Sequence, residues 1–331
     1  MNKKFRLVML GLVLAIFALT MSAFGAPKVM KIGHEMNPEH PEHQALLKFE
    51  ELFEERTNGE FDVQIFPSNQ LGSFFVQIQN MKQNIQQGHL NGLGWPGHFV
   101  PEFFLFNTAF AFKNFDEYAK AINSPVGLEI RQKLIDEHGI RLVSVSEWRR
   151  GVRNLLCKHP INSVDEVVGL KIRVPETPSY IESWKALGAS PTPVAFGEVY
   201  LALQQGVVDA MECPLDLIYS QKFYEPAKYI SLTGHLPELV ALGVTEKFYQ
   251  SLTDEQKVIL EECVTEAGIY NREIVANSEA DIKAKMAEAG VKYIEVDQNA
   301  FWEKGKNAAY NLEELEIWPK GFYDRIAESI K

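Results

Sequence analysis

Along the first part of the chain, segments with the spacing of apolar residues typical of strands alternate with a segment that has the spacing typical of a helix. Residues 28–33 form a short strand candidate, residues 43–56 carry apolar side chains three and four positions apart, and residues 61–67 alternate. The first and third patterns are typical of strands and the second of a helix, which ends at a Thr-Asn-Gly stop signal. This order predicts a βαβ unit.

The same patterns continue up to residue 146 and predict a second set of elements from Gly151 onward. Further helices are expected at 74–87, 116–123, 126–138, 178–187 and 197–205, with a short one near Ser163. Further strands are expected at 90–94, 140–146, 152–157, 170–175 and 208–212. The alternation predicts an α/β fold of two lobes, each with a mixed, mostly parallel sheet flanked by helices.

Residues 253–289 contain no proline, and their apolar side chains recur every three or four positions. The pattern predicts one helix of about 37 residues, or two helices with a break, and one helix would be roughly 55 Å long. That length is enough to lie across both lobes.

The N-terminal segment from Met1 to Gly25 reads as a secretory signal. A short basic stretch precedes an apolar run from Leu7 to Thr20, and small residues at Ala23 and Gly25 favour cleavage before Ala26. The alternative is an uncleaved anchor helix, but an apolar run of roughly 14 to 18 residues is short for a span of about 20. We therefore expect an exported chain without direct membrane insertion.

Charge and cysteine content narrow the classes of partner. The 331-residue chain has a net charge of −11, although the segment from Met1 to Gly25 contains basic and no acidic side chains. An acidic chain disfavours nucleic acid and anionic lipid as partners. Cys157, Cys213 and Cys263 are too few and too far apart for a Cys-rich zinc site, and at most one disulfide can form.

Two motifs have competing interpretations. Residues 92–97 match G-x-G-x-x-G, but Pro96 and Pro101 interrupt the helix that a dinucleotide site requires, so a tight turn after a strand is predicted. A metal-binding envelope protein using His34, His40 and His43 is the alternative function of another class. Prolines between these histidines disfavour a shared helix face, and a solvated loop leading into a helix is the preferred interpretation.

Enzymatic signatures are absent from the sequence. It has no G-x-S-x-G elbow and no serine, cysteine or histidine grouping with the spacing of a known hydrolase. A triad assembled from distant residues would not be visible, so a hydrolase stays an alternative at this point.

Four arginines lie close together in the sequence of this acidic chain. They are Arg149, Arg150, Arg153 and Arg173. In the strand at 170–175 the aliphatic residues share one face and leave Lys171 and Arg173 on the other. Arg173 is near the carboxyl end of its strand, where open α/β sheets bind ligands, and its planar guanidinium matches a carboxylate with two hydrogen bonds. An internal salt bridge is an equally good explanation of this residue.

Several motifs follow one another in a fixed order between residues 67 and 225. They are Gly-Val-Arg-Asn at 151–154, Asp-Glu-Val-Val-Gly-Leu-Lys-Ile-Arg-Val-Pro at 165–175, Leu-Gly-Ala-Ser-Pro-Thr-Pro at 187–193, Glu-Val-Tyr-Leu-Ala-Leu-Gln at 198–204, Gly-Val-Val-Asp at 206–209 and Lys-Phe-Tyr-Glu at 222–225. Pro-Ser-Asn-Gln-Leu-Gly at 67–72 adds an earlier loop. In this register the chain resembles the periplasmic solute receptors of tripartite ATP-independent periplasmic (TRAP) transporters, the C4-dicarboxylate-type receptor family.

The resemblance implies a two-lobed periplasmic receptor that closes over a small organic acid and delivers it to a sodium-coupled TRAP permease. It implies no enzyme activity and no cofactor. Lobe I would comprise residues 26–150 plus about 239–278, and lobe II residues 151–238 plus about 279–331, with the ligand cleft between them.

The resemblance also implies roles for individual residues. Arg173 would clamp the ligand carboxylate, and Arg153 would face the pocket. Further pocket positions fall on Glu176, Phe196, Cys213 and His235, with Trp95 and Pro96 on the opposing lobe.

The sequence departs from the sugar-acid members at two of these positions. Cys213 and Glu176 stand where sialic-acid receptors carry asparagine, which makes the pocket less suited to polyhydroxy acids. Flat apolar walls for an aromatic or branched carboxylate would come from Trp95, Trp148 and Phe196. A ligand ammonium would meet Glu176 or Glu212. The alternatives are that the aromatic residues pack in the core or stack on a sugar ring, in a uronate or dicarboxylate receptor of the same family.

Overall fold

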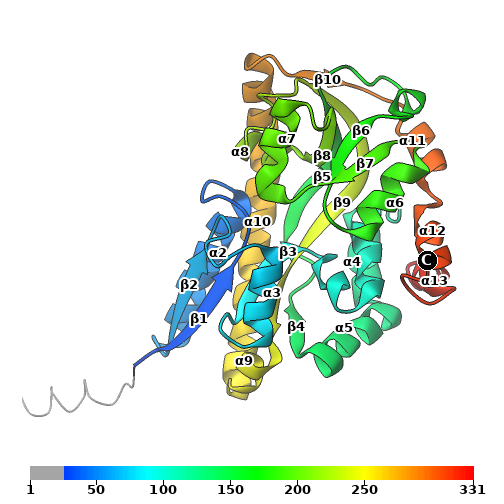
Figure 1. Cartoon of the computed structure of the whole chain (residues 1–331). Coiled ribbons are helices and arrows are strands. Elements are labelled where there is room, and N and C mark those ends of the chain that lie inside the picture. Colours follow the sequence, from blue (N-terminus) through cyan, green and yellow to red (C-terminus); the bar gives the residue numbers. More distant parts are fainter. Residues whose placement is uncertain (1–25) are drawn as a thin grey trace, which may run out of the picture.

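Two strands pass through the junction of the molecule and join its two halves into one mixed sheet. In the computed structural model, which describes residues 26–331, β9 (Tyr229–Thr245) is 17 residues long and pairs with β5 (Arg149–Cys157). The strand order is β2-β1-β3-β9-β5-β8-β6-β7, and β4 and β10 also pair with β9. Figure 1 shows β9 running from one half of the molecule into the other.

The N-terminal half is built on parallel strands. β1 (Lys28–Gly33) pairs with β2 (Phe61–Phe66) and with β3 (Gly88–Gly92), and the last residues of β9 run antiparallel to β3 and to β4 (Ile140–Val143). Its helices are α2 (Pro41–Arg56), α3 (Phe74–Lys82), α4 (Phe115–Asn123), α5 (Pro125–His138) and α9 (Glu246–Gln250). Short 3-10 turns η1 (Trp95–His98) and η2 (Pro101–Asn107) follow β3.

The other half combines both strand directions. β6 (Lys171–Val174) is parallel to β7 (Ser190–Pro193) and β8 (Ala210–Pro214), whereas β5 is antiparallel to β8 and β9. The remaining elements are η3 (Val164–Val167), α6 (Pro178–Ala186), η4 (Phe196–Glu198), α7 (Val199–Gln205), α8 (Leu215–Ser220), β10 (Lys292–Ile294), α11 (Gln298–Gly305), α12 (Ala308–Glu314) and α13 (Phe322–Ser329).

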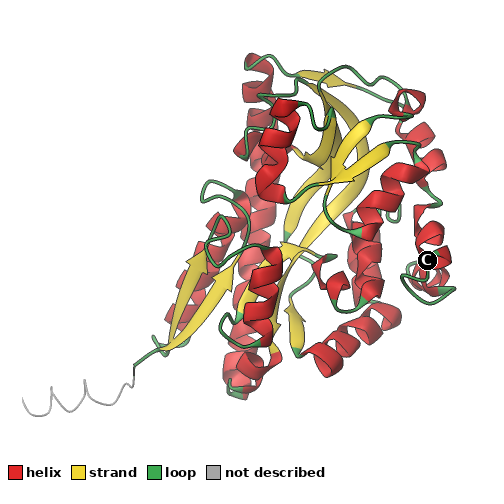
Figure 2. Cartoon of the chain, viewed as in Figure 1, coloured by secondary structure: helices red, strands yellow, loops and turns green. Residues whose placement is uncertain are grey.

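One helix lies along both halves. α10 (Asp254–Glu288) is 35 residues long and contacts α2 on one side of the junction and α8 on the other. It begins at a capping box in which the side chains of Thr253 and Gln256 bond each other's backbone amides. The prediction of a single helix is confirmed over the alternative of two, and Figure 2 shows this long helix behind α3, reaching into both halves.

The α/β class predicted from the periodicity is confirmed, but several elements differ from the prediction. The helix that begins at Phe74 ends at Lys82, because the chain turns at Asn84, whose φ is 56°, before β3 starts. The strand expected at 208–212 covers 210–214. The whole of β9 was not predicted, because Gly234 and Pro237 interrupt its pattern and most of its residues are buried on both faces.

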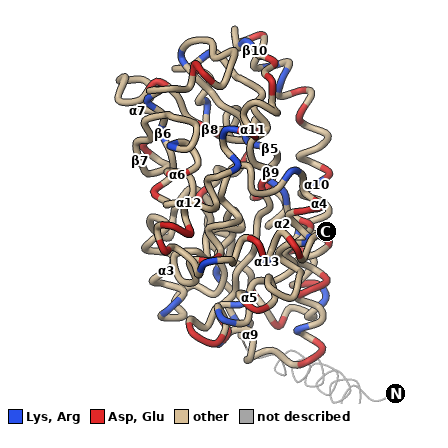
Figure 3. Tube along the Cα trace, turned by 90° about the vertical axis from the view of Figure 1, so that its right-hand side faces the viewer, with Lys and Arg blue, Asp and Glu red and all other residues tan. Residues whose placement is uncertain are grey.

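Export of the chain concerns residues that the structure does not describe. The expected signal segment, residues 1–25, lies outside the described part. Within residues 26–331, none of the helices is both long and apolar enough to cross a membrane. Acidic and basic positions are interspersed along the outer helices and loops (Figure 3).

Candidate ligand-binding cleft

A cavity of about 380 Å³ lies where the carboxyl ends of β1 and β6 face each other. The N-terminal half contributes Glu35, Asn91 and Trp95 to its lining, and the other half contributes Arg173 and Cys213 among others. Ligands of open α/β sheets bind at the carboxyl ends of strands, and a volume of this size suits a small molecule. The cavity is therefore the candidate ligand site.

Arg173 is the only one of the three lining arginines without a carboxylate partner in residues 26–331. Its side chain is 3% exposed, and Nε and Nη2 both donate to the carbonyl oxygen of Val194, at 2.9 and 2.7 Å. Burial lowers the pKa of Arg173 from its usual value, although the neighbouring Cys213 and Glu212 oppose this. The internal salt bridge considered for Arg173 is thus not formed in the described chain.

Arg153 has the opposite environment, because two carboxylates surround its guanidinium. Nε and Nη2 donate to the two Glu212 oxygens at 2.5 and 2.6 Å, and Nη1 donates to Glu238 at 2.5 Å. Burial alone would raise the pKa of Glu212, but the Arg153 guanidinium and a hydrogen bond from His235 hold it below its usual value. Arg153 lines the cavity, yet its donors already serve protein acceptors.

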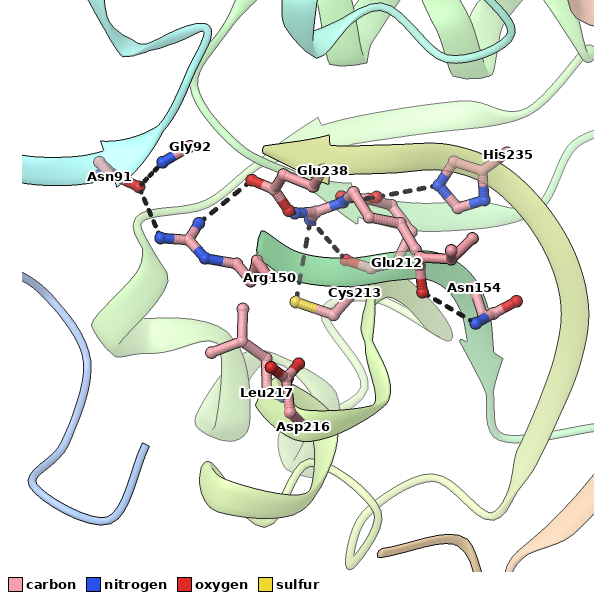
Figure 4. A network of polar contacts seen from close by, with 12 residues as sticks. Asn91, Gly92, Arg150, Asn154, Glu212, Cys213, Asp216, Leu217, His235 and Glu238 are labelled. Carbon is pink, nitrogen blue, oxygen red and sulfur yellow. Dashed lines mark hydrogen bonds and ion pairs between the residues drawn. The ribbon is translucent and has the colours of Figure 1, made fainter. Parts of the chain in front are cut away.

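Arg150 continues this pattern toward the N-terminal half. Its Nε and Nη2 donate to Glu42 at 2.5 and 3.1 Å, Nη1 donates to Glu238 at 3.1 Å, and Nη2 also reaches Asn91 at 3.1 Å. His235 completes the chain of contacts through Glu212, at 3.0 Å. We call Glu42, Arg150, Glu238, Arg153, Glu212 and His235 the buried charge network, most of which is drawn in Figure 4. It runs from α2 to β8 across the junction strands.

Glu35 is a lining carboxylate with a single hydrogen-bond donor among residues 26–331. It follows β1, is partly exposed, and accepts from Asn91 Nδ2 at 3.0 Å. Burial raises the pKa of Glu35, and the Asn91 bond and the charges of Arg150 and Arg173 only partly offset it. Its carboxylate therefore lacks the stabilisation that Glu212 has.

Aromatic side chains form part of the cavity wall. Trp95 is 3% exposed and donates from Nε1 to the Ala241 carbonyl at 3.3 Å, which fixes its ring. Phe196 is partly exposed and packs edge-on against Phe223, with ring centroids 5.8 Å apart. Tyr180 also lines the cavity. Flat apolar surface is thus present in both halves.

The structure brings six of the ten predicted site residues to the cavity. These are Arg173, Arg153, Trp95, Glu176, Phe196 and Cys213. The other four, Pro96, His235, Glu212 and Trp148, do not line it.

Two of these four correct specific expectations. Trp148 is fully buried and donates from Nε1 to the Val264 carbonyl of α10 at 2.9 Å, so it is a core residue and not a wall of the site. Glu212 lies behind Arg153 with no exposed surface, so it cannot meet a ligand ammonium directly.

The sequence interpretation missed Glu35, Asn91 and Glu238. Glu35 is the second residue after the strand at 28–33, so the rule that placed Arg173 at a strand end could have found it. Asn91 and Glu238 carry no such signal, because Glu238 sits in the unpredicted strand β9.

The histidine-rich segment is not a solvated loop. His34 and His40 are fully buried and His43 is 8% exposed, because the segment packs between the end of β1 and the first turn of α2. His34 Nε2 lies 3.1 Å from His43 Nδ1, whereas His40 caps α2 and faces Asp216. No group of three or more potential ligands for a metal occurs within residues 26–331, so the metal alternative lacks a site there.

The glycine motif and the cysteines have structural explanations. The predicted turn after β3 is present, since β3 ends at Gly92 and η1 begins at Trp95. A side chain at Gly92 would collide with Glu238, and one at Gly94 with Asn107, so close packing favours glycine at both positions. All three cysteines are buried and free. Burial raises the pKa of the Cys213 thiol to about 12, which makes it a small apolar surface of the cavity.

Comparison with known proteins identifies relatives over nearly the whole chain. The model of the DctP family, "Bacterial extracellular solute-binding protein, family 7", matches residues 32–314. A solute-binding protein of Roseobacter denitrificans is 32% identical over 312 residues, which cover 94% of this chain and 95% of that protein. The 2,3-diketo-L-gulonate-binding periplasmic protein of Escherichia coli is 30% identical over 293 residues, covering 87% and 88%.

Solved structures show the same fold. A TRAP periplasmic solute-binding protein of Fusobacterium nucleatum with bound sn-glycerol-3-phosphate has a TM-score of 0.84 at 29% identity, covering 92% of this chain and 97% of that chain. A protein of the same kind from Roseobacter denitrificans with bound L-galactonate has a TM-score of 0.81 at 29% identity, covering 92% and 99%.

Proposed function

The chain belongs to family 7 of the bacterial extracellular solute-binding proteins, a family of receptors and not of enzymes, and from this premise we propose what it captures. It binds a small organic acid in the cleft by its carboxylate and delivers it to the membrane subunits of a sodium-coupled TRAP permease. We propose that it does so in the periplasm after cleavage of the signal before Ala26.

The environment of Arg173 carries this proposal. A buried guanidinium without a carboxylate in direct contact is unfavourable, because the charges nearby, such as Glu212, only partly offset the loss of its hydration. Two of its nitrogens share one carbonyl acceptor, and no acceptor for Nη1 is present in the described chain. A ligand carboxylate would supply charge-assisted hydrogen bonds there. Arg153 and Arg150 are neutralised by the protein and position the junction strands instead.

Lobe closure follows from where the lining residues come from. We propose that residues 26–150 with about 239–278 move as one lobe and residues 151–238 with about 279–331 as the other, so that closure brings Trp95 and Arg173 onto one ligand. α10 and the junction strands β5 and β9 connect these units.

The relatives bear on the ligand class. Their names and bound ligands include 2,3-diketo-L-gulonate, L-galactonate and sn-glycerol-3-phosphate, all small polyhydroxy anions. The preference for an aromatic carboxylate predicted from the sequence has no support among them, and Trp148 no longer counts toward it. A uronate and a dicarboxylate both remain ligands to test.

The test is a thermal-shift and calorimetry panel of uronates, aldonates, dicarboxylates, hydroxy acids and amino acids. A ligand at 100 times its Kd should stabilise the protein by about 2.7 kcal/mol. Failure of every carboxylate to raise the melting temperature would overturn the proposed function.

A variant pair locates the carboxylate. Arg173→Lys should weaken binding at least tenfold while the fold survives, because an ammonium cannot form the two parallel bonds of a guanidinium. Lys171→Arg is the matched control, since this exposed residue lies on the same strand but does not line the cavity. Wild-type affinity in Arg173→Lys would remove Arg173 from the site.

A further inference from the structure

The cavity that holds Arg173 also carries acidic side chains. Glu35 lines it from the N-terminal half, and Glu176 and Glu198 line it from the other half. Glu176 and Glu198 are exposed, whereas Glu35 is only partly exposed and sits beside Asn91. The cavity therefore has a guanidinium without a carboxylate partner and a carboxylate without a cationic partner.

The cation with the strongest effect on Glu35 is engaged with other acceptors, and Arg173 acts on Glu35 without forming an ion pair with it. Arg150 is the cation with the largest effect on Glu35, but its nitrogens donate to Glu42, Glu238 and Asn91. Glu35 makes no ion pair among residues 26–331, and its one protein donor is the neutral amide of Asn91. Burial raises the pKa of Glu35, as expected for a carboxylate with too few donors.

We infer that the ligand is a zwitterion whose ammonium group binds Glu35 while its carboxylate binds Arg173. This inference rests on the proposed function, since it assumes the carboxylate at Arg173.

Charge balance favours an ammonium over a hydroxyl at Glu35. A hydroxy acid adds one negative charge to a cavity that already contains Glu35, Glu176 and Glu198, and it provides no cation to pair with Glu35. An amino acid adds no net charge, and it gives an ion-pair partner to both the Arg173 guanidinium and the Glu35 carboxylate. A hydroxyl and an ammonium can both donate to the Glu35 carboxylate, but only the ammonium adds the attraction of opposite charges, which is stronger in a poorly hydrated cavity than in water.

The experiment uses matched acids that differ in one group. Binding to the mature protein is measured by calorimetry for amino and hydroxy pairs: alanine and lactate, 4-aminobutyrate and 4-hydroxybutyrate, 5-aminovalerate and 5-hydroxyvalerate, and 2-amino-2-deoxyglucuronate and glucuronate. The pairs cover several separations of the two charges. In at least one pair the amino member should bind at least tenfold more tightly.

Glu35→Gln tests whether this preference arises at Glu35. Glutamine keeps the shape and can still accept from Asn91, so the fold should survive, and a melting curve checks this. The variant should lose the amino preference and retain its affinity for the hydroxy member within about threefold. Glu39→Gln, an exposed position in the same segment that does not line the cavity, should keep the preference.

The possible failures are distinguishable. If hydroxy acids bind as tightly as their amino partners, or if the amino preference persists in Glu35→Gln, the inference is overturned and the proposed function stands. If no carboxylate of either kind binds, both are overturned.

Discussion

Two buried histidines should make the protein less stable in mild acid. His89 has no exposed surface, and its Nδ1 lies 3.1 Å from Gln77 Oε1 while Nε2 has no hydrogen-bond partner in the described chain. His34 is equally buried and contacts His43. Burial lowers the pKa of each of the two to about 3, and a neighbouring Glu42 only partly opposes this.

The direction of the effect follows from proton linkage. As the pH falls below about 6.5, the ordinary pKa of histidine, the unfolded chain takes up a proton at each of the two histidines. The folded chain does not do so until the pH approaches 3. The free energy of unfolding therefore falls as the pH drops through this window. Between pH 7.5 and pH 5.0 the loss is about 2 kcal/mol for each histidine, or about 4 kcal/mol for both.

Urea denaturation at pH 7.5 and pH 5.0, followed by circular dichroism, measures this loss. His89→Gln should reduce the difference in unfolding free energy between the two pH values by about 2 kcal/mol, because it removes one proton uptake while every other group contributes equally. Glutamine retains polar atoms toward Gln77, although the variant is expected to be less stable at pH 7.5. A reduction no larger than the extrapolation error of such measurements, about 0.5 kcal/mol, would refute the argument.

Three further predictions concern the junction, the cavity thiol and the long helix. Arg150→Ala leaves Glu42 and Glu238 buried without this cation and should destabilise the protein by about 3–5 kcal/mol in urea denaturation, and an unchanged midpoint would contradict the ion-pair assignment. At pH 8, Cys213 should react with a maleimide at least a hundredfold more slowly than a free thiol, measured by peptide mass spectrometry, because its pKa of about 12 leaves little thiolate. Thr253→Ala removes the capping side chain of α10 and should lower the unfolding free energy by about 1 kcal/mol, whereas no change would show that the cap is dispensable.

The local pattern of apolar and polar residues was sufficient to predict part of the fold and part of the candidate site. Most helices and strands follow from apolar spacing, and Arg173 follows from its position at the end of an alternating strand. Such residues are predictable because the property that identifies them is contained in a few neighbours along the chain.

Other features depend on contacts between distant segments. Glu238 reaches Arg150 and Arg153 only because β9 crosses the junction, and neither its neighbours nor its charge indicates this. The role of Trp148 illustrates the same limit, since a large aromatic side chain suits a core as well as a ligand wall. The buried histidine segment was misjudged because its polar composition is typical of surface loops.

The long junction strand also affects how the chain matures during synthesis. The residues that pair with Gly88–Gly92 are Val240–Val244, about 150 positions further along, and Lys292 pairs with Tyr229 later still. Until the ribosome has released these residues, the edges of β3 and β5 have no partner there and are open to other unpaired strands. Incomplete chains that end before β9 should therefore aggregate, and neither half should be obtainable as a separate receptor fragment.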